Sequence, residues 1–75
     1  MALKGKVRAY LREYILELFD RYGELTMAFV TEQTQKRYPN YGVTKMRVTM
    51  ICSEMKAEGI LEYEDAGVRG KWRRI

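Results

Sequence analysis

The chain has 75 residues, 47% of them hydrophobic, and a formal net charge of +4 from 14 Lys and Arg against 10 Asp and Glu. This length allows one small domain, and a single cysteine without any histidine excludes an intramolecular disulfide and a cysteine–histidine zinc site. No apolar run is long enough to span a membrane, and the first residues, MALKGKVR, lack the apolar core of a signal peptide. We therefore expect a soluble cytoplasmic protein that forms a single domain over residues 1–75, with no cofactor, metal or membrane contact.

The first predicted element is a helix over residues 6–22. Apolar side chains recur there at the helical period, and Gly23 follows directly as a residue suited to end a helix. Its predicted buried face consists of Val7, Leu11, Tyr14, Ile15, Leu18 and Tyr22, with Tyr10 and Phe19 at the margins. Leu16 projects opposite this face; we interpret it as an exposed leucine, the alternative being a dimer contact that it forms together with Phe19.

A short extended segment, Glu24–Leu25, precedes a second helix that Thr26 caps and that runs to about Arg37. Its predicted core-facing residues are Met27, Val30, Thr34 and Tyr38. The helix ends before Pro39, because a proline disfavours helical geometry in the residue that precedes it. A polar turn follows, in which we interpret Tyr38 and Tyr41 as covers of the core, with contact to phosphates as the alternative.

The stretch from Thr44 to Gly59 predicts a third helix, with Thr44 as its N-cap and Gly59 just past its C-terminus. Its predicted buried face consists of Val48, Ile51, Cys52 and Met55. Beside this face lie Lys45, Arg47, Thr49, Ser53 and Lys56, and opposite it lie Met46, Met50 and Ala57. Basic and small polar groups at the front of a helix that is buried on one side favour its insertion into a DNA major groove.

After Gly59 the pattern becomes extended and predicts a β-hairpin. Residues 60–64 and 71–75 are the two expected strands, and the loop between them, residues 65–70, contains two glycines. Leu61 and Tyr63 share one face of the first strand, and Trp72 and Arg74 share one face of the second.

The charges are unevenly spread along the chain. The basic residues that crowd its two ends are Lys4, Lys6, Arg8 and Arg12, and then Arg69, Lys71, Arg73 and Arg74. The acids Glu54, Glu58, Glu62, Glu64 and Asp65 lie between them. We interpret basic clusters that are held apart from acidic ones as a surface for a polyanion, the alternative being an ordinary solvated surface.

With this order of elements, the chain resembles the winged helix-turn-helix superfamily. The resemblance rests on Leu25–Thr26 at the start of the second helix, on the turn at Tyr38–Val43, and on the segment VTMICSEMKAEGILEYED. It covers nearly the whole chain and implies an α+β fold of three helices with a C-terminal β-hairpin, the wing. In the family, the third helix usually reads the major groove and the wing touches phosphate or the minor groove.

The resemblance also implies which residues bind nucleic acid. On the third helix these are Thr44, Lys45, Arg47, Thr49 and Ser53, and on the wing Arg69, Lys71, Arg73 and Arg74. The chain departs from the family pattern in a longer turn before the third helix, and in Met46 and Met50 at the outermost positions of that helix. Three interpretations of the methionines stay open: contact with thymine methyl groups, contact with a protein, and burial of one of them under the hairpin.

We predict a binding protein and not an enzyme, because the chain has no histidine, no Gly-rich phosphate loop, and no serine or cysteine beside a credible base. The first hypothesis is a sequence-specific double-stranded DNA-binding protein that regulates transcription, acting as a homodimer on a symmetric site. The second is a winged-helix adaptor that binds RNA or a protein partner. Nothing in the sequence indicates a small-molecule ligand.

Overall fold

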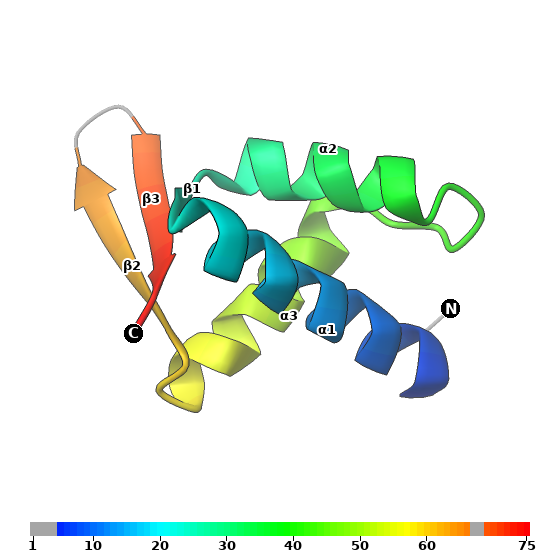
Figure 1. Cartoon of the computed structure of the whole chain (residues 1–75), viewed down its shortest axis with the longest axis horizontal. Coiled ribbons are helices and arrows are strands. Elements are labelled where there is room, and N and C mark those ends of the chain that lie inside the picture. The colour runs from blue at the N-terminus through cyan, green and yellow to red at the C-terminus, as the bar shows by residue number, and fades with distance from the viewer. Residues whose placement is uncertain (1–4, 67–68) are drawn as a thin grey trace.

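Three helices and a small antiparallel sheet make up the structure, a computed structural model that describes residues 5–66 and 69–75 (Figure 1). Of residues 65, 66 and 69 it describes the backbone alone. The elements in chain order are α1 (Gly5–Tyr22), β1 (Glu24–Leu25), α2 (Met27–Arg37), α3 (Lys45–Ala57), β2 (Leu61–Ala66) and β3 (Arg69–Arg74). The predicted order of three helices followed by a hairpin is therefore confirmed.

The last strand, β3, lies in the middle of the sheet, whose order is β1-β3-β2. It pairs antiparallel with β2 over its whole length, and Trp72 lies between Tyr63 of β2 and Leu25 of β1. The hairpin strands are longer than predicted, since pairing continues through residues that the sequence pattern assigned to the loop. The extended segment at β1 forms ladder bonds to a strand far away in the sequence, so it is part of the sheet and not only a connection.

The core lies where the three helices meet each other and one face of the sheet, which stands at one end of the helices in Figure 1. Seven residues of the predicted buried faces of the three helices lie together in this core and are at most 4% exposed: Leu11, Ile15, Leu18, Val30, Val48, Ile51 and Met55. Leu61 of β2 and Trp72 of β3 complete this core from the sheet. The helical periodicity of the sequence therefore identified the main contacts between the helices.

Helix α1 is rotated slightly from its predicted orientation. Phe19, predicted at the margin, is 1% exposed, whereas Tyr22, predicted on the buried face, is 53% exposed. Tyr22 lies at the end of the helix and packs its ring edge-on against Phe29 of α2, with 5.3 Å between the ring centroids. Leu16 is half-buried against the core, so the prediction that it is exposed is wrong, and Phe19 is fully buried. The alternative of a dimer contact at Leu16 stays a prediction.

The predicted helix ends are confirmed by their hydrogen bonds. The hydroxyl of Thr26 accepts from the backbone N–H of Phe29 at 3.3 Å, and that of Thr44 accepts from the N–H of Arg47 at 3.2 Å. At the end of α3, Gly59 has a φ of 80°, and the next N–H, that of Ile60, donates to the carbonyl oxygen of Met55 at 2.9 Å. These caps fix where α3 begins and where the chain turns into the hairpin.

Cys52 lies in the core as predicted, and burial raises the pKa of its thiol to about 12. We expect the folded protein to be nearly inert toward a thiol reagent such as DTNB, because the thiolate is scarce and the sulfur is covered. Denaturant should restore rapid labelling, which a colorimetric assay follows directly. Equal labelling rates in native buffer and in denaturant would contradict the burial of Cys52.

Candidate nucleic-acid interface

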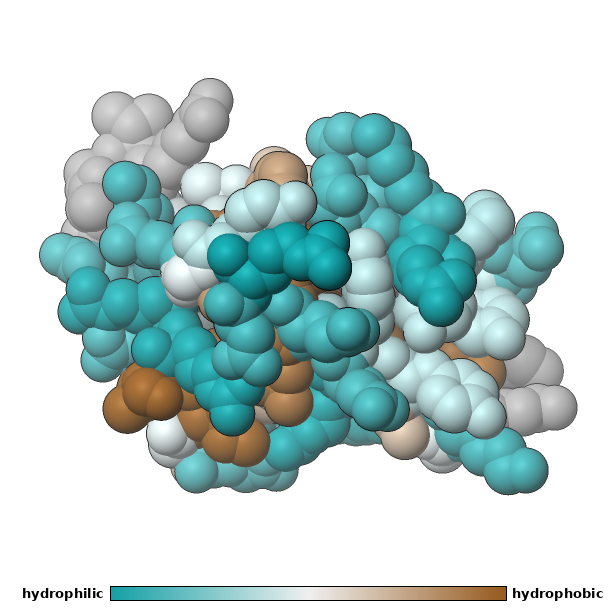
Figure 2. Space-filling model, viewed as in Figure 1, coloured by the Kyte–Doolittle hydropathy of each residue, from teal (hydrophilic) through white to brown (hydrophobic). Residues whose placement is uncertain are grey.

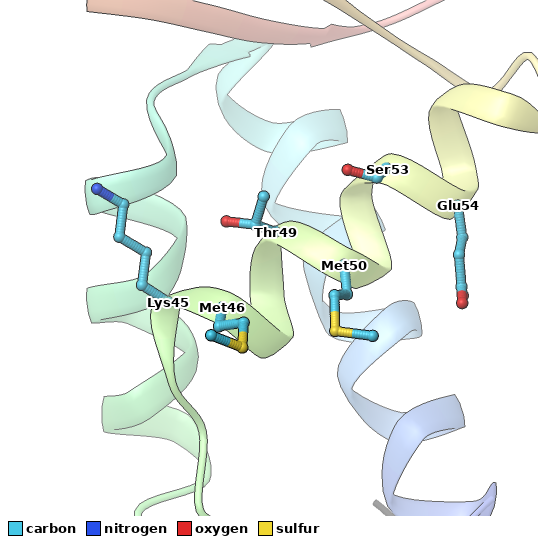
Figure 3. Close-up of a pocket in the computed structure, with 6 residues that line it drawn as sticks. All are labelled: Lys45, Met46, Thr49, Met50, Ser53 and Glu54. Atoms are coloured by element: carbon cyan, nitrogen blue, oxygen red, sulfur yellow. The ribbon is translucent and has the colours of Figure 1, made fainter. Parts of the chain in front are cut away.

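Two rows of side chains project from α3, as Figure 3 shows. Residues four apart stack along one side of a helix. One row consists of Lys45, Thr49 and Ser53, and the other of Met46, Met50 and Glu54. Together they surround a shallow, mainly apolar depression on the outer face of α3. Both methionines are exposed, Met46 to 73% and Met50 to 55%, so the hairpin covers neither of them.

Lys45 and Thr49 of the polar row line a groove between α2, α3 and the hairpin. The residues that line it are Met27, Ala28, Lys45, Thr49, Tyr63, Gly70 and Trp72, and its volume is about 580 Å³. The described residues of this lining include one cation, Lys45, and no carboxylate. A second hollow continues the groove toward the C-terminus of α3, between Lys56 and the hairpin. The hairpin therefore forms one wall of a channel that runs beside α3.

Tyr63 forms the exposed part of this wall and rests on the backbone of Gly70. A Cβ atom at position 70 would lie 1.8 Å from the Tyr63 hydroxyl oxygen, so the ring occupies this position only above a glycine. On one side the ring packs against Trp72, with 5.0 Å between centroids, and Lys56 Nζ lies 6.0 Å from its centre. None of the three residues Tyr63, Trp72 and Lys56 is among the binding residues predicted from the sequence.

Arg47 lies on the flank of α3 that faces the α2–α3 turn. Its Nη1 donates a hydrogen bond to the carbonyl oxygen of Gly42 at 3.0 Å. At 100° per residue, Arg47 and Lys45 project on opposite sides of the exposed methionines. The structure therefore brings Thr44 and Arg47 together at the turn, and Lys45, Thr49 and Ser53 together along the groove.

The predicted wing residues Lys71 and Arg73 lie on the other face of the sheet. Side chains alternate along a strand, and Trp72 between them faces the groove. Lys71 Nζ lies 3.2 Å from a carboxylate oxygen of Glu24, while Arg73 forms ion pairs with Glu62 and Glu64. The hydrogen bond to Glu62 is the main cause that raises the pKa of Arg73. Two predicted wing residues remain. Arg74 is paired with an acid of α1, since its Nη1 donates to Asp20 Oδ1 at 2.6 Å, and the side chain of Arg69 lies outside the described residues.

Two basic residues of α1, Arg8 and Arg12, are also paired with acids. Helix α1 crosses α3 (Figure 1). Arg8 forms an ion pair with Glu54, and Arg12 forms one with Glu58. Arg12 binds both carboxylate oxygens of Glu58, at 2.5 and 3.2 Å, and this contact lowers the pKa of the Glu58 carboxyl. The prediction that basic clusters are held apart from acidic ones is wrong, because it counted distance along the chain and not in space.

Figure 2 shows the face of the molecule that carries α1, and this face is mainly hydrophilic. Its most hydrophobic part lies near the C-terminus and the α3–β2 connection. Among residues 5–66 and 69–75, no helix has both the length and the apolar character that a membrane span requires. The same part of the chain contains no group of three or more His, Cys, Asp or Glu side chains placed to hold a metal ion.

Comparison with known proteins supports the fold. No sequence-family profile and no curated protein sequence matches the chain. A solved structure of HOP2, from a study of that protein's DNA recognition and protein interaction domains and its homologous DNA pairing, is similar to the chain with a TM-score of 0.67. The similarity covers 91% of this chain and 97% of the HOP2 chain at 16% sequence identity. The chain has the winged-helix fold that the sequence predicted, with three helices and an antiparallel hairpin.

Proposed function

We propose that the protein binds double-stranded DNA, with α3 in the major groove, and that it regulates transcription through this binding. The observation that carries the proposal is the polar row of α3: Lys45 and Thr49 line a groove whose described lining has a cation and no carboxylate, and Ser53 lines the hollow that continues it. A duplex backbone needs cations, and base edges need hydrogen-bonding groups on a protruding element. The likeness to HOP2, a protein described by its DNA recognition and DNA pairing, agrees with this choice. The function is binding and not catalysis.

The residues of α3 divide by role in this proposal. Thr44, Lys45 and Arg47 surround the N-terminus of the helix, where the helix dipole favours phosphate oxygens. Thr49 and Ser53 lie further along the exposed face and contact base edges. Arg47 contacts DNA beside the α2–α3 turn, next to its hydrogen bond with Gly42.

In this proposal, Lys71 and Arg73 of the wing contribute less to the affinity for DNA than Lys45 does. Lys71 and Arg73 already neutralise Glu24, Glu62 and Glu64, so contact with a phosphate requires them to leave those partners. Arg69 belongs to the proposed wing contacts on the strength of its position in β3 next to the hairpin turn.

The salt dependence of DNA affinity distinguishes Lys45, which lines the groove, from Lys71, which is paired with a carboxylate of β1. A substitution that removes one phosphate contact lowers the slope of log affinity against log salt by about one unit. Lys45→Ala should lower it by about this amount, and Lys71→Ala should lower it clearly less. Lys36→Ala is the matched control, since Lys36 is exposed on α2, pairs with Glu32, and lines neither hollow beside α3. Fluorescence anisotropy over a salt series measures all three; equal slopes for Lys45→Ala and Lys36→Ala would exclude Lys45 from the interface.

The proposed function itself is tested by comparing three probes of equal length: duplex DNA, single-stranded DNA and structured RNA. We expect the duplex to bind most tightly, and footprinting on genomic fragments near the protein's own gene to reveal a protected site. A homodimer on a symmetric site predicts two chains per site, which sedimentation of the complex would measure. Absence of duplex binding by the folded protein would rule the proposal out.

A protein-binding adaptor is the second candidate function. The exposure of Met46 and Met50 favours it, because flexible methionines are common on adaptable protein-binding surfaces. In that case Met46→Ala with Met50→Ala would abolish capture of the partner, and the protein would show no preference for duplex DNA. Tighter binding to structured RNA than to either DNA would instead support an RNA-binding adaptor.

A further inference from the structure

The outward face of α3 is poor in groups that read bases by hydrogen bonds. Paired hydrogen bonds to a base usually come from Arg, Lys, Asn or Gln; α3 contains no Asn or Gln, and Lys45 lies in the row beside the methionines and not between them. Its one arginine, Arg47, lies on the flank and donates to the carbonyl oxygen of Gly42. The centre of the exposed face instead holds Met46 and Met50, on either side of an apolar depression (Figure 3). If α3 enters the major groove with this face, the two methionines at its centre require an apolar group on the bases as their contact.

The major groove presents one such apolar feature, the C5-methyl group of thymine. Cytosine and uracil have a hydrogen at this position, so a side chain that contacts the methyl group discriminates against both. Met46 and Met50 are four residues apart, which places them about 6 Å apart along the helix axis. This spacing is close to two base-pair steps of about 3.4 Å each. Two methionines one helical turn apart therefore match two methyl groups on base pairs that are two steps apart.

The polar surroundings of the methionines favour a nucleic acid over an apolar protein surface as the occupant. Lys45 begins the adjacent row, and the hydroxyls of Thr49 and Ser53 follow it along the same side (Figure 3). The carboxylate beside this face, that of Glu54, is paired with Arg8 of α1, which reduces its repulsion of a polyanion. The face thus has a narrow apolar strip beside cationic and hydroxyl groups, which is complementary to methyl groups beside phosphates.

We infer that Met46 and Met50 contact the C5-methyl groups of thymines in the major groove, and that the protein prefers thymine-containing sites for this reason. The inference rests on the proposed function, because it requires α3 to enter the major groove of a duplex. The inference adds the chemical group that α3 recognises, the thymine methyl group. It assigns this recognition to two side chains that donate no hydrogen bond.

The test compares two DNA duplexes of identical A·T-rich sequence, one with thymine and one in which deoxyuridine replaces every thymine. The exchange removes the methyl groups and leaves the pairing edges and phosphates intact. We expect the uracil duplex to bind more weakly, by about fourfold if one methionine contacts a methyl group and by up to about 15-fold if both do. Fluorescence anisotropy at one fixed salt concentration measures both affinities.

Two variants identify the residues responsible. Met46→Ala with Met50→Ala should lower the affinity for the thymine duplex to that for the uracil duplex, while changing the latter little. Both side chains are exposed and alanine favours helix, so the fold should survive, and circular dichroism checks this. Lys45→Ala should weaken both duplexes by the same factor, since phosphates are common to both.

Each of the remaining outcomes would contradict a different claim: methyl recognition, its assignment to the two methionines, or duplex binding itself. Equal affinity of the wild-type protein for the two duplexes would overturn methyl recognition and leave duplex binding intact. Full discrimination in the folded double methionine variant would overturn the assignment to Met46 and Met50. Binding to neither duplex would overturn the proposed function and this inference with it.

Discussion

Replacing Trp72 with alanine should lower the free energy of unfolding by about 3–5 kcal/mol, the usual cost of removing a buried large aromatic side chain. Trp72 is 6% exposed in the middle strand of the sheet, directly between Leu25 and Tyr63. Its removal deprives β1 and β2 of a side chain that both contact, and opens a cavity beneath the groove. A domain of this size has a total stability of roughly 5–15 kcal/mol, so the substitution would remove much of it.

Chemical denaturation followed by circular dichroism measures this effect, because the variant lacks the chain's single tryptophan and with it the usual fluorescent probe. Tyr63→Ala is the matched control: it removes the aromatic partner of Trp72 from a position that is 40% exposed, and should cost clearly less. Trp72→Phe fills most of the site and keeps the comparison measurable if the alanine variant does not fold. Equal destabilisation by Trp72→Ala and Tyr63→Ala would contradict the central role of Trp72.

Leu18→Ala should destabilise the protein by about 2–5 kcal/mol, since Leu18 is 4% exposed in the core between the helices and the sheet. Leu16→Ala provides a matched control, because the same substitution occurs in the same helix, two residues away, at a half-buried position. The two variants share the change in helix propensity, so the difference between them reports burial alone. Thermal and urea unfolding measure both.

A smaller destabilisation by Leu18→Ala than by Leu16→Ala would mean that α1 presents a different face to the core. The comparison also tests the dimer alternative for Leu16. A contact between two copies at Leu16 would make the unfolding midpoint depend on protein concentration, and Leu16→Ala would remove that dependence.

The pattern of residues predicted the local structure well. Helical periodicity identified the buried face of α3, and the capping residues Thr26, Thr44 and Gly59 marked helix ends that the structure confirms. These features depend on residues within one or two helical turns of each other, so the sequence contains all that is needed to infer them. Strand alternation also indicates that Lys71 and Arg73 lie on the face of the sheet opposite Trp72, so the sequence alone contains the reason why they do not line the groove.

The sequence by itself therefore determined the three helices, their caps, the hairpin and most of the core, because short-range periodicity and capping chemistry specify them. Only the tertiary structure decided which charges neutralise each other, as Arg8 does with Glu54, and Arg12 with Glu58. It also decided that Met46 and Met50 both stay exposed, and that Tyr63 rests on Gly70 to form a wall of the groove. These outcomes depend on the angle at which α1 crosses α3 and on the register of the hairpin. Both follow from packing between segments far apart in the chain, which the periodicity of each segment does not specify.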